Sequence, residues 1–253
     1  SFSGITYALH LNSMDAGGTF DVAGFSFVGA PGIFAGHNRD VAYTETSAFA
    51  DVMDMWEVEI TDDGVALVGG EEIAVVKREE VIDIKGGEPE VIEVTEIPGL
   101  GVVVPHTLVG SPIPIAATGK EAVLGWTGFK ARPARFFRGL MRVGSLDEFE
   151  EAVLGMPEMT YNFVAADVDG ISYRVGVEVP ARNPITPERR PYTVMDGSDP
   201  MALWPDASLT AEQLPHSRGA DRGWIATANH DPYGVTADGQ VDNAPFYYRA
   251  IFP

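Results

Sequence analysis

Two carboxylates three residues apart, Asp51 and Asp54, interrupt the largely apolar stretch "FAGHNRDVAYTETSAFADVMDMW". Calcium binds hard oxygen ligands, which proteins supply as carboxylates and backbone carbonyls. A bend in the backbone would let both carboxylates and a carbonyl between them reach one ion. Acids at this spacing also cap helices and turns, and spacing by itself favours that second interpretation.

Two asparagines lie where a side-chain amide has either a chemical or a structural use. Asn38 follows His37 in a Gly-rich turn, and the other histidines are distant in sequence, so a turn is favoured over a metal site. Asn229, in "GWIATANHDP", follows a run that reads as a strand. An Asn at a strand end can donate to a developing oxyanion, or it can form an Asx turn before Pro232. The residues alone leave both roles of Asn229 open.

Ser1 is a candidate nucleophile if it is a true N-terminus. The α-amino group of an N-terminal residue titrates at about 7.7–8.0, so it can accept the proton of its own hydroxyl. A serine at this position can equally be left by a cleavage or a domain cut. The sequence has no G-x-S-x-G motif to support a Ser-His-Asp triad instead.

The charge of the chain restricts its partners. There are 17 Lys and Arg against 37 Asp and Glu, a formal net charge of -20 at pH 7. Duplex nucleic acid is then an unsuitable partner, because its binding depends on cations that neutralise phosphates. No run of 18 apolar residues is present, so no segment is expected to span a membrane. We expect neither nucleic acid nor a membrane among the partners.

The elements that must position these groups read as many short strands with few helices. The 253 residues suit a single domain over 1–253, and the absence of Cys removes disulfides and thiolate metal sites. Alternation of apolar residues predicts strands at 5–11, 22–28, 41–46 and 55–60. Gly86-Gly87 and Asp169-Gly170 predict two hairpins, the first with acids on its solvated face.

Helices are predicted only in the middle of the chain. Pro133 stands at a helix-entry position. Ser145 and Glu148 form a capping box, and the helix that follows has one apolar face made of Leu146, Phe149 and Val153. Strands with a few helices between them indicate the α+β class.

Four motifs, taken in order, resemble those of the penicillin amidase family, which includes acyl-homoserine-lactone and aculeacin acylases. "DVAGFSFVGAPGIFAGHNRDVAYTETSAFADVMDMWEVE" resembles the family's D-V-x-G, P-G and G-H-N segments, followed by a strand and an Asp-containing calcium loop. "KREEVIDIKGGEPEVIEVTE" is similar to the next hairpin of the family. "YNFVAADVDG" is similar to its N-[FW]-x-x-A-D-x-x-G stretch, and "GWIATANHDP" to its G-[YW]-I-A-x-x-N-x-x-P motif.

This resemblance implies an N-terminal-nucleophile hydrolase with an αββα sandwich, present here in part. It implies hydrolysis of the amide bond of a small N-acyl compound, such as a β-lactam or an acyl-homoserine lactone, through an acyl-enzyme. The backbone N–H of Ser47 and the side chain of Asn229 match the two oxyanion donors, and Arg249 matches a basic residue of the active-site region. The implied Ca²⁺ ligands are Asp51, the carbonyl of Met53, and Asp54, with Pro191 and Asp238 as further candidates.

Four further positions match the acyl pocket of the family. Phe49 and Tyr161 match pocket-lining positions. Ala35 and Glu45 stand where phenylacetyl-selective members carry an aromatic and a small polar residue. Ala35 would widen the pocket and Glu45 would add a carboxylate near its wall. The resemblance thus implies a preference for an acyl group other than phenylacetyl, either longer or cationic.

The match also departs from the family pattern. In the family, the nucleophilic Ser is followed by Asn and a Trp-containing strand before the strand that matches "ITYALHL", whereas here Ser1 leads directly into Ser3-Gly4-Ile5. We therefore expect an internal part of the β-chain, whose partners are the α-chain, with its calcium-binding Glu, and the remaining β-chain segments. The resemblance implies a periplasmic or secreted acylase. The alternative is a non-catalytic, calcium-stabilised β-rich binding module or a decayed homologue.

Overall fold

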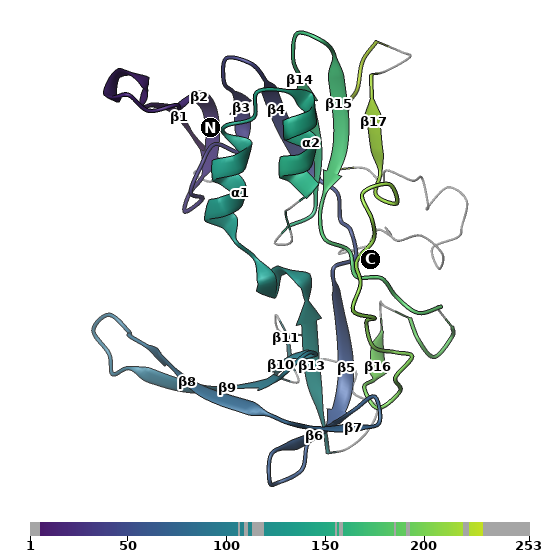
Figure 1. Cartoon of the computed structure of the whole chain (residues 1–253). Helices are drawn as coiled ribbons and strands as arrows, with labels where there is room; N and C mark the ends of the chain where they lie inside the picture. Colours follow the sequence, from purple (N-terminus) through teal and green to yellow (C-terminus); the bar gives the residue numbers. More distant parts are fainter. Residues whose placement is uncertain are drawn as a thin grey trace. The chain divides into compact units, whose positions relative to one another are not determined.

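The structure, a computed structural model, describes residues 6–105, 107–108, 111–112, 119–154, 156, 159–184, 186–190, 193–219 and 223–229. These residues belong to two compact units (Figure 1). The first unit comprises 1–52, 127–179 and 208–253, and the second comprises 53–126 and 180–207. This grouping leaves the single domain over 1–253 as a prediction. Within the described ranges, every helix is too short or too polar to cross a membrane.

The first unit is built on a seven-stranded antiparallel sheet. Its strand order is β1-β2-β3-β4-β14-β15-β17. The strands are β1 Thr6–Asn12, β2 Asp21–Phe27, β3 Ala35–His37, β4 Ala42–Ser47, β14 Tyr161–Ala166, β15 Ile171–Gly176 and β17 His216–Arg218. The central pair β4 and β14 joins segments more than 100 residues apart in sequence, in the register Ser47↔Tyr161.

Two helices, α1 (Pro133–Leu140) and α2 (Leu146–Leu154), lie over one face of this sheet (Figure 1). The predicted apolar face of α2 is confirmed, because Leu146, Phe149 and Val153 are all buried. They pack with sheet residues such as Phe163 in one apolar cluster. The burial of this aromatic-rich layer is the main force that holds helices and sheet together.

The predicted helix signals are present with one variation. Pro133 occupies the first turn of α1. The N–H of Glu148 donates to Ser145 Oγ over 3.2 Å, as a capping box requires, but the Glu148 carboxylate accepts from the N–H of Gly144 over 2.7 Å. The reciprocal bond is thus displaced by one residue.

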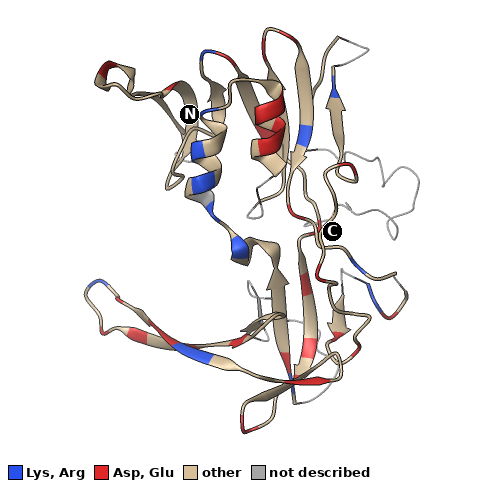
Figure 2. Cartoon of the chain, viewed as in Figure 1, with Lys and Arg blue, Asp and Glu red and all other residues tan. Residues whose placement is uncertain are grey.

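The two helices differ in charge, since α1 carries arginines and α2 carries acids (Figure 2).

The second unit contains a six-stranded sheet and two small ones. The large sheet has the order β16-β5-β13-β10-β9-β8. Its strands are β16 Val194–Asp196, β5 Met53–Glu59, β13 Lys120–Trp126, β10 Gly101–Val104, β9 Glu90–Ile97 and β8 Val76–Ile82. The small sheets pair β6 Val65–Val68 with β7 Glu71–Ala74, and β11 Thr107–Leu108 with β12 Ser111–Pro112. The hydrophobic core of the second unit surrounds Trp56, which is fully buried.

The hairpin predicted around Gly86-Gly87 is formed by β8 and β9, in the register Val81↔Val91. The expectation of a single solvated acidic face was incomplete. All seven residues of β8 are exposed, and Val81 and Val91 are exposed together with the acids. All of β8 and residues 90–93 of β9 are exposed, so alternation along this part of the hairpin buries neither face, whereas the other end of β9 pairs with β10 and buries Ile97.

Candidate active site

The end of β4 and the segment 223–229 meet through polar contacts. Ser47 N donates to Asn229 Oδ1 over 2.9 Å, across 182 residues of sequence. One residue earlier, the hydroxyls of Thr46 and Thr227 lie 2.6 Å apart, and Asn229 N donates to Thr46 Oγ1 over 3.4 Å. The structure thus brings together the two predicted oxyanion donors. The threonine pair that aligns them was not singled out from the sequence.

The prediction that a strand precedes Asn229 was wrong. Residues 224–227 have no regular secondary structure, and Asn229 itself has a φ of 56°. Its connection to the sheet is made by side chains, through Thr227 and Asn229, and not by a backbone ladder. The apolar run 224–226 therefore reads as a strand without pairing as one, and Trp224 is 59% exposed.

The backbone is strained on both sides of this contact. Phe49 (φ 55°) and Asn229 (φ 56°) are the non-glycine residues with positive φ in the described ranges. The left-handed region is uncommon for a residue as bulky as Phe. Such a conformation costs about 1–3 kcal/mol at a residue such as Phe49 and less at Asn229, since Asn tolerates it, and such residues cluster at functional sites. Their position two residues after Ser47 and at Asn229 itself marks this place in the fold as a candidate site.

The arrangement can bind an oxyanion after one local rotation. Here the amide oxygen of Asn229 accepts the Ser47 N–H. A substrate oxygen that takes this N–H displaces Oδ1, and rotation of the amide about its last torsion turns Nδ2 toward the same oxygen. An N–H pair of this kind stabilises the tetrahedral intermediate of acyl transfer.

The four predicted pocket residues do not share one face of the sheet. Tyr43 is buried toward the helices, so Glu45, two residues on, projects from the same face. Tyr161 packs there too, with its ring 4.8 Å from that of Phe34. Ala35 instead lines a groove of ≈ 730 Å³ on the opposite face.

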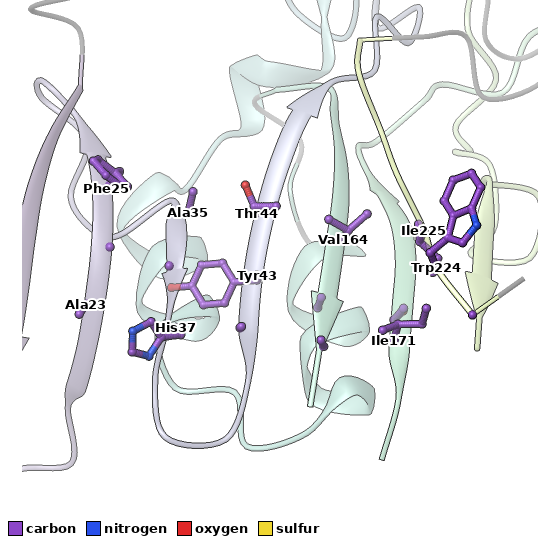
Figure 3. A pocket seen from close by; sticks show the side chains of 17 residues that line it. Ala23, Phe25, Ala35, His37, Tyr43, Thr44, Val164, Ile171, Trp224 and Ile225 are labelled. Atoms are coloured by element: carbon purple, nitrogen blue, oxygen red, sulfur yellow. The ribbon is translucent and has the colours of Figure 1, made fainter. Parts of the chain in front are cut away.

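Figure 3 shows this groove with Phe25, Ala35, Thr44 and Val164 along it and the helices behind the sheet. Trp224 and Ile225 lie at one end of it (Figure 3). Ala35 therefore lies on the face of the sheet opposite the helices, whereas Glu45 and Tyr161 lie on the face that the helices cover. Sequence matching could not assign these residues to different faces, because the face on which a strand residue lies depends on the pairing register and on its position in the alternation along the strand.

Glu45 is a carboxylate in an apolar environment. Across the ladder it pairs with Phe163, and its Oε2 is buried without a hydrogen-bond partner among the described residues. Burial raises the pKa of Glu45 to about 7, because desolvation disfavours the charged form. Burial, and after it the Glu45 charge, also raises the pKa of Tyr161 and of Tyr43.

Glu45→Gln should remove a pH-dependent loss of stability from the full-length protein that contains this chain. The unfolded carboxyl titrates near 4.5 and the folded one near 7, so the folded state binds the proton more tightly. Stability of the unaltered protein should therefore fall as pH rises from about 4.5 to 7 and then level off. Thermal midpoints at pH 5 and pH 8 measure this, and the variant should lose less between them. An equal loss in both proteins would contradict the buried carboxylate.

The two predicted calcium carboxylates are both buried, one in each unit. Asp51 is 4% exposed and Asp54, on β5, is 0% exposed. Arg182 Nε donates to Asp54 Oδ2 over 2.9 Å, and Trp204 Nε1 donates to the same oxygen. Met53, whose carbonyl is the third predicted ligand, is the first residue of β5. The Asp54–Arg182 pair was not foreseen, because its partners are 128 residues apart.

The chemistry of these groups fits calcium, since carboxylates and carbonyls are hard oxygen donors and a buried carboxylate needs positive charge. Arg182 already supplies such a charge to Asp54. Within the described ranges, no three His, Asp or Glu side chains converge as a metal cluster. Pro191 and Asp238, together with Ser1 and Arg249, lie outside the described residues.

A sequence model of the family described as penicillin amidase matches residues 1–250. The chain belongs to the penicillin amidase family. It is 28% identical over 240 residues to "Penicillin acylase 2 proenzyme" of Pseudomonas sp. (strain SE83), covering 93% of this chain and 29% of that protein. It is 25% identical over 235 residues to "Acyl-homoserine lactone acylase QuiP" of Pseudomonas aeruginosa, covering 90% and 27%.

A solved structure has a similar fold. The thermostable penicillin G acylase from Alcaligenes faecalis matches with a TM-score of 0.71 at 18% identity, over 96% of this chain and 41% of that one. At this identity the likeness shows the fold. The expected α+β sandwich of the N-terminal-nucleophile hydrolase type, present in part, is confirmed. The chain spans less than a third of the length of both named penicillin amidase relatives.

Proposed function

We propose that this chain supplies the oxyanion-binding part of an acylase that hydrolyses the amide bond of a small N-acyl compound. The observation that carries the proposal is the contact between Ser47 N and the Asn229 side chain at 2.9 Å. A second support is the pair of non-glycine residues with positive φ, Phe49 and Asn229, around that contact. Both relatives named above are called acylases.

In the proposed reaction, a serine hydroxyl attacks the substrate carbonyl, and its proton passes to the α-amine that serves as base. The carbonyl oxygen becomes an oxyanion, which accepts from the Ser47 N–H and from Asn229 Nδ2. Collapse of this intermediate breaks the C–N bond, and the leaving amine takes the proton. Water then cleaves the acyl ester by the same steps, with the same two donors.

The nucleophile is either Ser1 or a serine outside residues 1–253, and we favour the second. The family pattern places a Ser-Asn pair and a Trp-containing strand before the part that matches this chain. The proposed partners are accordingly an α-chain and further β-chain segments. Intact-mass analysis after treatment with a sulfonyl fluoride, with peptide mapping, tests the choice. An adduct on Ser1 would assign the nucleophile to this chain.

A substrate panel tests the proposed activity. Amides of one chromogenic amine with phenylacetyl, octanoyl and 6-aminohexanoyl groups would be incubated with the full-length protein that contains this chain. Hydrolysis of at least one amide supports an acylase. A folded protein that cleaves none, and that no sulfonyl fluoride labels, would point to the non-catalytic binding module.

The same panel tests the substrate class. We expect phenylacetyl to be a poor acyl group, because Glu45 projects a buried carboxylate two residues from Ser47 on the same strand. A cationic or hydrogen-bonding acyl group would provide the partner that this carboxylate lacks among the described residues. Glu45→Gln should narrow the difference between 6-aminohexanoyl and octanoyl substrates. A phenylacetyl amide as the best substrate of the unaltered protein would refute this preference.

The proposal includes a bound calcium ion. Asp51, the Met53 carbonyl and Asp54 would hold the ion, which would add stability and not chemistry. Removal of calcium with EGTA is expected to lower the thermal midpoint of the full-length protein. A ligand at 100 times its Kd contributes about 2.7 kcal/mol. Added Ca²⁺ should restore the midpoint and Mg²⁺ should not, because Mg²⁺ requires a smaller octahedral site.

An unchanged midpoint in EGTA would contradict the calcium site and would leave Asp54 to its protein partners, Arg182 among them. The proposed location, periplasmic or secreted, follows from the family resemblance. Fractionation of cells that express the full-length protein from its natural start codon tests it.

A further inference from the structure

Asn162, on β14, is a polar side chain with no access to solvent, since it is 0% exposed. An amide buried in this way is costly unless both of its ends are hydrogen-bonded. Both ends are bonded here. Asn162 Nδ2 donates to the carbonyl of Ser47 over 3.0 Å, and Tyr173 Oη donates to Asn162 Oδ1 over 2.7 Å.

The partners fix the orientation of this amide. A backbone carbonyl can only accept, so the NH₂ end of Asn162 must face Ser47. The oxygen end then faces Tyr173, whose hydroxyl must donate. An Asp at this position would present a second acceptor to the Ser47 carbonyl and would repel it. The site therefore requires an amide and not merely a side chain of this size.

These bonds act on the residue whose N–H is the proposed oxyanion donor. Ser47 is the last residue of β4, and its N–H meets Asn229. Only φ and ψ of Ser47 separate its N–H from its own carbonyl, so a fixed carbonyl restricts where the N–H points. The next backbone bond, from Ala48 N to Thr160 O, holds the chain after this peptide.

We infer that Asn162, oriented by Tyr173, is a positioning residue that aims the Ser47 N–H at the oxyanion. This inference rests on the proposed function and adds a role for two residues to which that function assigns no substrate contact. The three strands β4, β14 and β15 lie side by side, so the oxyanion donor is held from the interior of the sheet. A displacement of about 1 Å in such a donor can cost on the order of 100-fold in rate.

The test compares Asn162→Asp and Tyr173→Phe in the full-length protein that contains this chain, with the best amide of the panel as substrate. Asn162→Asp should lower kcat by about 10–100-fold with KM changed less than about 3-fold, because the transition state is affected more than ground-state binding. Tyr173→Phe keeps the bond to Ser47 and should lower kcat by less than about 10-fold.

Asn38→Asp is the matched control. Asn38 also donates its amide to a carbonyl, that of Val143, over 2.7 Å, and accepts from the N–H of Val41 over 2.8 Å. It lies in the turn before β4, and among the described residues its side chain bonds to Val143, Asp40 and Val41 and not to Ser47 or Asn229, so its variant should leave kcat unchanged where the fold persists. Thermal midpoints of both variants report any general loss of structure.

A double-variant cycle separates positioning from a structural role. In an Asn229→Ala background, where one oxyanion donor is absent, Asn162→Asp should cost clearly less in kcat than it does alone, because the two act on one interaction. Equal costs in both backgrounds, or a kcat loss matched by Asn38→Asp, would overturn the inference. If the unaltered protein hydrolyses no amide, the proposed function fails instead, and that result is read before any variant is made.

Discussion

Asn229→Ala is expected to lower kcat of the full-length protein by about 10²–10³-fold, with little change in KM. The side chain would donate to an oxygen that carries full charge only in the transition state, so ground-state binding depends on it little. Steady-state kinetics on the best amide of the panel measures the effect. A loss confined to KM would show that Asn229 binds substrate and does not stabilise an oxyanion.

Two further variants make this result specific. Ser47→Ala should retain kcat within about 3-fold, because the proposed donor is the backbone N–H and not the hydroxyl. Asn12→Ala removes an exposed amide on β1 and should have no effect on the rate. A large kcat loss in Ser47→Ala would move the chemistry to the serine hydroxyl.

Arg182→Met is expected to lower the free energy of unfolding by about 3–5 kcal/mol, because it removes a cation that hydrogen-bonds the buried carboxylate of Asp54. The Arg182 side chain is 15% exposed and that of Asp54 is 0% exposed, so water screens the pair little. Urea unfolding followed by tryptophan fluorescence measures the change, in EGTA so that no bound ion substitutes for the arginine.

The control is an ion pair in solvent. Lys77 and Glu93 lie 2.8 Å apart on the β8–β9 hairpin, and both side chains are 55% exposed. Lys77→Met should cost about 0–1 kcal/mol, as exposed pairs do. Equal costs for the two variants would contradict the importance given to burial. A smaller cost for Arg182→Met in calcium than in EGTA would support a cation site at Asp54.

The sequence indicated a role for the residue behind the first of these two predictions and none for the residue behind the second. Asn229 was predicted as an oxyanion donor from its motif, and the structure places it against Ser47. Arg182 carried no signal, since a single arginine in a proline-rich segment has many uses. Asn162 did carry a signal, since it is the first residue of the matched "NFVAAD" stretch. No role for Asn162 was predicted from the sequence.

The sequence by itself determined the local features and the family. The cap and buried face of α2 depend on contacts within one or two turns, so residue order suffices to predict them. The turn at Asn38 is likewise local, since its side chain accepts from Asp40 N and Val41 N over 2.8 Å each. Motif order along the chain was enough to predict the penicillin amidase family, which the match over 1–250 confirms.

Only the tertiary structure decided which of these residues meet. Ala35 and Glu45 were grouped in one pocket, yet strand pairing places them on opposite faces of one sheet. Ser47, Asn162 and Asn229 come together because β4, β14 and the segment 223–229 are adjacent in space while far apart in sequence. Register and long-range pairing fix such contacts, and neither is encoded in the spacing of residues along the chain.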